Sequence, residues 1–143
     1  MSDIKRRQEE VLNEFALLNE EGEMLLLYLV KVGKELSRFG KVDYSDGNIL
    51  KGCNATVWLD SKLEDSRMYF FADSNTAITR GLISLLLRIY QGQSPEDILG
   101  SELFFIRQSN LSRFIGSAHS NGFATIDLEI RERAKRCCSL ADA

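Results

Sequence analysis

The sequence predicts an α+β fold in which helices pack on a small antiparallel sheet of three strands. Apolar residues recur at helical spacing towards both ends of the chain, whereas between residues 49 and 72 they alternate with polar residues. The only proline is Pro95, and no repeat or low-complexity tract divides the chain. We therefore expect residues 1–143 to form a single domain.

Two helices are expected before the sheet. Residues 2–18 place a loose apolar stripe opposite a charged face, which is typical of a helix at the surface of a domain. A second helix is predicted over residues 22–39, with Gly40 as its left-handed C-terminal cap. The apolar face of this second helix consists of Leu25, Leu29, Val32 and Leu36.

The sheet is predicted from a change in the spacing of apolar residues, from a helical period to alternation. Apolar and other side chains alternate over residues 55–59, which indicates a strand. A charged turn over residues 60–66 leads into the aromatic segment 68–72, which forms the second arm of an antiparallel hairpin. The short apolar pair at residues 49–50 is expected to supply the third strand.

The rest of the chain is expected to be helical. A largely buried helix is predicted over residues 74–89, with Ser74 as its N-cap. A short helix over residues 94–100 is indicated by an N-cap serine, a proline at the first helical position and an acidic first turn. A turn over residues 117–122, which contains His119, then precedes the last helix.

Composition limits the class of partner. The formal charge of −3 and the pI near 5.3 supply no general attraction for nucleic acids or anionic membranes. The longest apolar run, residues 24–30, is too short to span a bilayer, and the N-terminus lacks the apolar stretch of a signal peptide. The odd number of cysteines, three, favours reduced thiols. We expect a cytoplasmic protein that binds a protein or a small molecule, with no nucleic acid and no membrane.

Cys53 is the leading candidate for chemistry. It follows Gly52 at the start of a predicted strand, where a glycine permits the tight turn that presents a side chain. Lys51 adds positive charge, and the N–H groups of the loop help to hold an anion, which favours a reactive thiolate. A packed cysteine at a strand edge fits the same local sequence. The local sequence leaves both interpretations open.

Other chemistry is disfavoured by spacing. His119 is the only histidine, and a hydrolase that paired it with Cys53 would lack both an oxyanion-hole signature and a third orienting residue. The cysteines at 53, 137 and 138 show no C-x-x-C pattern, so no metal site is expected. No nucleotide, dinucleotide or calcium-loop motif is present, so no cofactor is expected.

Several segments, in their order and spacing, resemble the SufE-type sulfur acceptors. Residues 51–58, K-G-C-N-A-T-V-W, are similar to the G-C-x-x-x-V-W segment of that family. Residues 72–82 are similar to its G-D-S-D-x-x-I-V-K-G-L segment, and residues 94–98 resemble T-P-x-D-I. Residues 121–122 match the start of its last helix. The resemblance covers most of the chain.

The resemblance implies a SufE/IscU-like α+β domain with an acceptor cysteine on a loop between two strands. Cys53 would take persulfide sulfur from a pyridoxal-phosphate-dependent cysteine desulfurase, stimulate that enzyme and pass the sulfur to an iron–sulfur scaffold complex. The protein would then be an accessory to an enzyme and not an enzyme itself. The resemblance places the following residues at the surface that meets the partner: Lys51, Gly52, Asn54, Asp73 and His119.

The chain departs from the family pattern at three positions. His119 stands where the family usually has an arginine, Asn75 replaces an aspartate, and Arg80 replaces a lysine. At position 119 a permanently charged guanidinium has become a ring that titrates. These changes indicate a docking surface that is adjusted to its own desulfurase.

Two other functions stay open on the sequence. One is an iron–sulfur cluster scaffold of related fold, and the other is a binding module without sulfur chemistry. A cluster normally needs several thiolate ligands, whereas the loop has Cys53 alone and the other cysteines lie near the C-terminus. This argues against the scaffold. A monomer and a homodimer are both compatible with the sequence.

Overall fold

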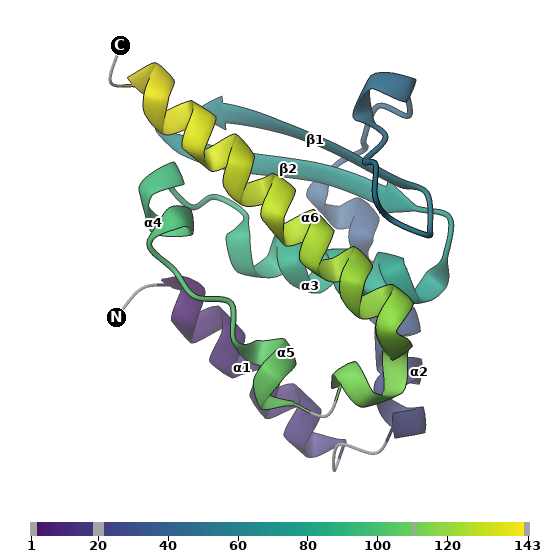
Figure 1. The fold of residues 1–143 in the computed structure, drawn as a ribbon. Coiled ribbons are helices and arrows are strands. Elements are labelled where there is room, and N and C mark those ends of the chain that lie inside the picture. Colours follow the sequence, from purple (N-terminus) through teal and green to yellow (C-terminus); the bar gives the residue numbers. More distant parts are fainter. Residues whose placement is uncertain (1–2, 19–21, 110, 142–143) are drawn as a thin grey trace.

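A hairpin and a set of helices that pack against it make up the fold (Figure 1). The structure is a computed structural model, and it describes residues 3–18, 22–109 and 111–141. It is a mixed α+β architecture, as predicted, with helices packed on a small antiparallel sheet. The elements in chain order are α1 (Asp3–Leu17), α2 (Gly22–Gly33), η1 (Leu36–Phe39), η2 (Asp46–Asn48), β1 (Val57–Glu64), β2 (Arg67–Ser74), α3 (Ala77–Tyr90), α4 (Pro95–Leu99), α5 (Phe105–Gln108) and α6 (Leu111–Ala141).

The sheet of the described residues has two strands, so the prediction of three is wrong. The pair at residues 49–50 contributes an isolated bridge between Ile49 and Trp58 and a 2.8 Å hydrogen bond from the Leu50 N–H to the Val57 carbonyl. No ladder follows, because the chain turns away at Gly52, where φ is +94°. The segment that carries Cys53 therefore leaves the sheet as a loop.

The hairpin is longer and tighter than predicted. β1 continues to Glu64, which pairs with Arg67, so the charged turn expected over residues 60–66 is reduced to two residues. Asp65 and Ser66 both have positive φ, 52° and 65°, the combination whose twist matches that of the flanking strands. Along β2 every second side chain is buried, and these side chains form one wall of the core.

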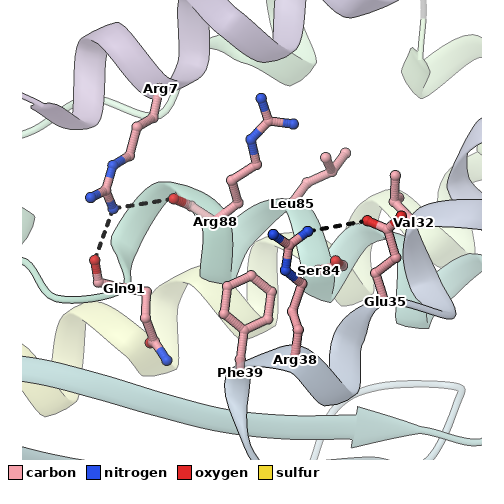
Figure 2. Close-up of a pocket in the computed structure, with 9 residues that line it drawn as sticks. All are labelled: Arg7, Val32, Glu35, Arg38, Phe39, Ser84, Leu85, Arg88 and Gln91. Carbon is pink, nitrogen blue, oxygen red and sulfur yellow. Dashed lines mark hydrogen bonds and ion pairs between the residues drawn. The ribbon is translucent and has the colours of Figure 1, made fainter.

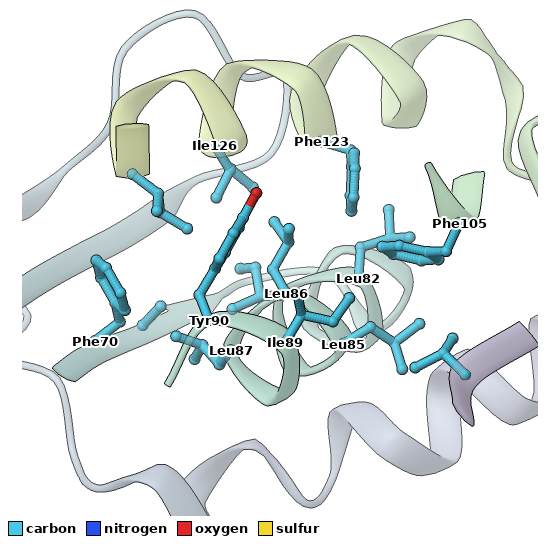
Figure 3. Close-up of a cluster of buried hydrophobic side chains, with 14 of the residues drawn as sticks. Phe70, Leu82, Leu85, Leu86, Leu87, Ile89, Tyr90, Phe105, Phe123 and Ile126 are labelled. Carbon is cyan, nitrogen blue, oxygen red and sulfur yellow. The ribbon is translucent and has the colours of Figure 1, made fainter. Parts of the chain in front are cut away.

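Helix α3 is the centre of the core, as its wide apolar face predicted (Figure 3). Its N-cap is Thr76 and not Ser74, which is the last residue of β2. Gly81 allows α2 to approach closely, because a Cβ at this position would lie 2.2 Å from the carbonyl oxygen of Leu29. Helix α4 agrees with the prediction, with the Ser94 hydroxyl accepting from the Asp97 N–H at 3.1 Å.

Two helical boundaries were predicted wrongly. Helix α2 ends at Gly33, and the short helix η1 continues the apolar face to Phe39. Gly40 has φ 104° and ψ 170°, which is outside the left-handed cap geometry. Near the C-terminus, the turn expected over residues 117–122 is helical, and the backbone of α6 breaks instead at Gly116, with φ 80° and ψ 166°.

Helix α6 consequently brings residues 117–122 over the core. Its buried side chains, Phe123, Ile126, Ile130 and Ala134, recur at helical spacing and belong to the same hydrophobic cluster as α3 and both strands. Figure 1 shows α6 crossing the hairpin and α3. This crossing places the early turns of α6 beside the loop that precedes β1.

Candidate functional site

The loop over residues 51–56 carries Cys53 between the Ile49 bridge and the start of β1. Gly52 adopts φ +94°, a conformation that a side chain disfavours, although a Cβ at this position would have ordinary contact, 3.6 Å, with Thr125 Cγ2 of α6. The glycine is therefore required by the backbone and not by lack of space. The turn directs Cys53 towards α6.

The Cys53 side chain is half-buried and packs against the hydrophobic core. Its Sγ lies 3.9 Å from the carbonyl oxygen of Gly122, to which the thiol donates a weak hydrogen bond. Burial raises the pKa of the Cys53 thiol, because a thiolate loses solvation in this environment. In the free protein at neutral pH the thiol is mainly protonated.

Cys53 opens on a mostly apolar cavity of about 190 Å³. The cavity lies between the loop, the start of α3 and the early turns of α6, three segments that are far apart in the sequence. Its remaining lining consists of Asn54 and Ala55 from the loop, Thr76, Thr79 and Leu82 from α3 and its cap, and His119, Gly122, Phe123 and Ile126 from α6. A cavity of this size has room for atoms added to the sulfur and shelters them from water.

His119 lines this cavity from α6, although it was expected in a turn. The ring is half-buried, and its Nδ1 lies 2.8 Å from the carbonyl oxygen of Ile115. A carbonyl only accepts, so Nδ1 carries the proton in this contact and the neutral ring has its lone pair on Nε2.

The other predicted partner-binding residues lie in two groups. Lys51, Gly52 and Asn54 are exposed on the loop beside Cys53. Asp73 lies apart from the cavity at the end of β2, where it accepts a 2.6 Å hydrogen bond from the Tyr44 hydroxyl and forms a 3.1 Å ion pair with Arg80. The structure thus places Asp73 in a group of contacts with Tyr44 and Arg80 and not in the lining of the cavity.

Sequence reasoning missed two features of the site. Asn75 Oδ1 accepts from the Thr56 N–H at 3.0 Å, and the Asn75 N–H donates to the Thr56 carbonyl at 3.3 Å, which fixes the C-terminal end of the loop. The threonines of the cavity wall, Thr76 and Thr79, share a 2.7 Å hydroxyl hydrogen bond. Their i,i+3 spacing at a helix start was the available signal for the second feature.

A second, larger cavity of about 580 Å³ lies between α1, η1 and α3 (Figure 2). Arg7, Arg38 and Arg88 line it together with apolar side chains, but no cysteine does. Cys138 lies near the C-terminus, with its Sγ 3.8 Å from Glu96 Oε1. Within the part of the chain that the structure describes, no three or more His, Cys, Asp or Glu side chains are grouped to hold a metal ion.

None of the described helices combines the length and the apolar character needed to cross a membrane.

Comparison with known proteins places the chain in one family. The SufE family model, described as "Fe-S metabolism associated domain", matches residues 9–134. An uncharacterized SufE-like protein of Rhizobium etli is 29% identical over 132 residues, which are 89% of this chain and 88% of the relative. A second, from Rhizobium meliloti, is 26% identical over 132 residues, covering 89% of this chain and 94% of the relative.

A solved structure supports the fold independently. The solution structure of a hypothetical protein from Thermus thermophilus has a TM-score of 0.73 to this structure at 15% identity. The likeness covers 93% of this chain and 96% of that one. With the family match over most of the chain, these findings show that the protein belongs to the SufE family of domains associated with Fe–S metabolism.

Proposed function

We propose that the protein is a sulfur acceptor for iron–sulfur cluster assembly, with Cys53 as the residue that carries the sulfur. One observation carries the proposal. The half-buried Sγ of Cys53 opens on an apolar cavity that is formed by α3, α6 and the loop over residues 51–56, which we call the acceptor loop. Membership of a family associated with Fe–S metabolism supports the same chemistry.

The proposed reaction is an exchange between two sulfur sites. The Cys53 thiolate attacks the outer sulfur of a persulfide on a cysteine desulfurase, the bond from that sulfur to the desulfurase thiol breaks, and the thiol leaves as a thiolate. No electrons are gained or lost overall, so neither an oxidant nor a bound cofactor is needed. Removal of the sulfur frees the desulfurase thiol for the next cycle, which is how an accessory protein would stimulate the enzyme.

The cavity would protect the loaded sulfur. A persulfide that is open to solvent reacts with oxidants and other thiols, and apolar walls reduce that access. Leu82, Phe123 and Ile126 supply such walls beside Cys53. Because the thiol is half-buried, the loop must move outward when the desulfurase docks.

We further propose that the surface around the loop is where a pyridoxal-phosphate-dependent desulfurase docks in the cytoplasm. The exposed Lys51, Gly52 and Asn54 flank the acceptor sulfur and would contact the enzyme directly. Asp73 would act through Arg80, whose guanidinium it holds at 3.1 Å. The sulfur would then pass to an iron–sulfur scaffold complex.

Intact mass measurement tests this function. The protein is mixed with a pyridoxal-phosphate-loaded cysteine desulfurase and free cysteine, and its mass is recorded without reductant. We expect a gain of one sulfur atom that is lost in Cys53→Ser and retained in the double variant Cys137→Ser/Cys138→Ser. Equal loading of Cys53→Ser would refute the assignment.

The same preparation separates the alternatives. A cluster scaffold would develop iron-dependent visible absorbance after reconstitution with iron and sulfide, and a plain binding module would gain no sulfur at all. The cavity that Cys53 lines contains no second cysteine, which favours the acceptor over the scaffold.

A further inference from the structure

The cavity beside Cys53 contains one imidazole, that of His119. We propose that His119 is the proton acceptor that converts the Cys53 thiol into the attacking thiolate. The inference rests on the sulfur-acceptor function proposed above, and it adds a chemical role for a second residue of the same cavity.

The Cys53 thiol needs such a group. Burial raises its pKa, and no neighbouring charge among the described residues offsets this effect. An ordinary cysteine with a pKa of about 8.5 is only about 3% thiolate at pH 7, and burial makes that fraction smaller. A base in the cavity would accept the thiol proton, because solvent has only limited access to this half-buried side chain.

Backbone geometry brings the ring to the thiol. His119 and Gly122 are three residues apart on α6 and therefore lie on the same face of the helix. The carbonyl of Gly122 is the group that Cys53 Sγ contacts, at 3.9 Å. The imidazole thus lines the same cavity about one helical turn from that contact, and the cavity has room for a water that relays the proton.

The hydrogen bonding of the ring leaves the required atom available. Nδ1 is held by the Ile115 carbonyl at 2.8 Å, and this contact fixes both the tautomer and the orientation of the ring. Among the groups that the structure describes, including their side chains, none is hydrogen-bonded to Nε2. Nε2 therefore keeps its lone pair for a proton.

No other group among the described lining residues competes for this role. Apart from Cys53 and His119, the lining side chains from the loop, α3 and α6 are amide, hydroxyl or apolar groups. Of the nearby charged residues, Lys51 is exposed on the loop, Arg80 on α3 pairs with Asp73, and Asp127 on α6 accepts from Tyr90 and pairs with Arg131.

The proton balance of the transfer then closes between Cys53, His119 and the desulfurase thiol. Cys53 gives its proton to His119 Nε2, and the thiolate forms a new S–S bond to the outer sulfur of the desulfurase persulfide. The old S–S bond breaks, and the imidazolium returns the proton to the departing desulfurase thiolate. No other proton carrier is required.

Alkylation of Cys53 by iodoacetamide at neutral pH tests the proposal. The full chain is used in the Cys137→Ser/Cys138→Ser background, so that Cys53 is its single thiol. With His119 present, we expect the rate at neutral pH to be about ten times that of His119→Gln, because the ring takes the proton from the thiol. An unchanged rate in His119→Gln overturns the proposal.

A second measurement needs no change at position 119. Because His119 is the only histidine, its ring protons give an unambiguous NMR titration in the unmodified protein. Titration of a thiol beside the ring must alter that curve, so we expect the His119 titration to differ between the wild type and Cys53→Ser. Coincident curves overturn the proposal, whether or not His119→Gln folds.

The failure of this inference is distinct from failure of the proposed function. If His119→Gln accepts sulfur at the wild-type rate at neutral pH while Cys53→Ser accepts none, His119 loses its role and the acceptor function stands. If Cys53→Ser is loaded as well as the wild type, the function itself fails.

Discussion

The Cys53 cavity and the larger cavity beside Arg88 share helix α3 as a wall and differ in almost every other respect. On one side Thr79 and Leu82 face the small apolar cavity of Cys53, and on the other side Ser84 and Arg88 face the larger cavity. In the larger cavity the protein itself supplies partners for the charges: Arg88 pairs with Glu14, and Arg7 Nη1 donates to the Gln91 carbonyl at 2.8 Å (Figure 2).

This difference shows that the volume of a cavity does not by itself identify the candidate functional site. The larger cavity has three arginines, and the third, Arg38, lies 3.3 Å from Glu35, so each guanidinium has a partner within the fold. The smaller cavity has a half-buried thiol and an imidazole whose Nε2 is available. Chemical groups that the fold leaves unused are the better guide to function.

The largest expected effect on stability comes from disrupting the packing of α3, the helix that lines both cavities. In Gly81→Val, the new Cβ would lie 2.2 Å from the Leu29 carbonyl oxygen, so α2 and α3 must separate. We expect a loss of about 3 kcal/mol or more in the free energy of unfolding, measured by urea denaturation. Gly47→Ala is the control, since nothing lies within 4 Å of its new Cβ. A stability of Gly81→Val equal to that of the control would contradict the close packing of these helices.

The next effect separates the two cavities by function. In Ala55→Leu, added bulk enters the Cys53 cavity, and we expect the rate of sulfur loading by a desulfurase to fall about tenfold, because the sulfur is displaced from its position. Ser84→Ala changes the lining of the larger cavity and should leave loading unchanged. Equal losses in the two variants would mean that the cavities do not act separately.

A pH-dependent effect is expected in the larger cavity. Arg88 Nη1 donates to Glu14 Oε1 at 2.9 Å, and this hydrogen bond lowers the pKa of the Glu14 carboxyl. A lowered pKa in the folded state adds stability above the unfolded value of about 4.3, and that stability is lost as the pH falls through the folded value.

We therefore expect Glu14→Gln to cost about 1 kcal/mol near neutral pH, because both side chains are about one-third exposed and solvent screens the pair. The difference from the wild type should vanish in strong acid, as measured by denaturation at a series of pH values. A cost that is constant with pH would rule out the ion pair as its source.

The smallest effect concerns the base of the acceptor loop. Asn75→Ala removes the acceptor of the 3.0 Å hydrogen bond from the Thr56 N–H, which is exposed, so we expect a loss of about 0.5 kcal/mol. Asn75→Asp keeps an oxygen at that position and should be close to the wild type. Thermal unfolding of the three proteins compares them, and equal losses in both variants would show that the oxygen is not the stabilising group.

Much of the fold could be predicted because local patterns agreed with tertiary packing. The buried face of α3 and the capping residues of α4 are examples. The end of β1 could not be predicted, because residues 61–64 of this strand lie at its exposed end and show no alternation of buried and exposed side chains. Helix α2 was extended too far because Leu36 of η1 keeps the apolar spacing after the helix has ended.

The candidate site was predictable in its residues but not in its assembly. The local sequence made Cys53 a candidate for a reactive thiol, and the family resemblance made His119 a candidate for contact with the partner. Their shared cavity depends on α6 crossing the loop, a contact between residues more than sixty positions apart that no spacing rule reveals. Serine, asparagine and glycine in residues 117–122 favoured a turn, and packing of the following apolar residues on α3 overrode that preference.

Hydrogen bonds hold both ends of the loop over residues 51–56, and under the proposed function this limits the distance over which sulfur can be delivered. The Leu50 N–H is bonded to Val57 at one end, and Thr56 is bonded to Asn75 at the other. Cys53 is three residues from Leu50 and three from Thr56. Even a fully extended loop would therefore move the Cys53 Sγ only about 10 Å from the edge of the hairpin. Under the proposed function, the donor and the recipient of the sulfur must both come to that edge.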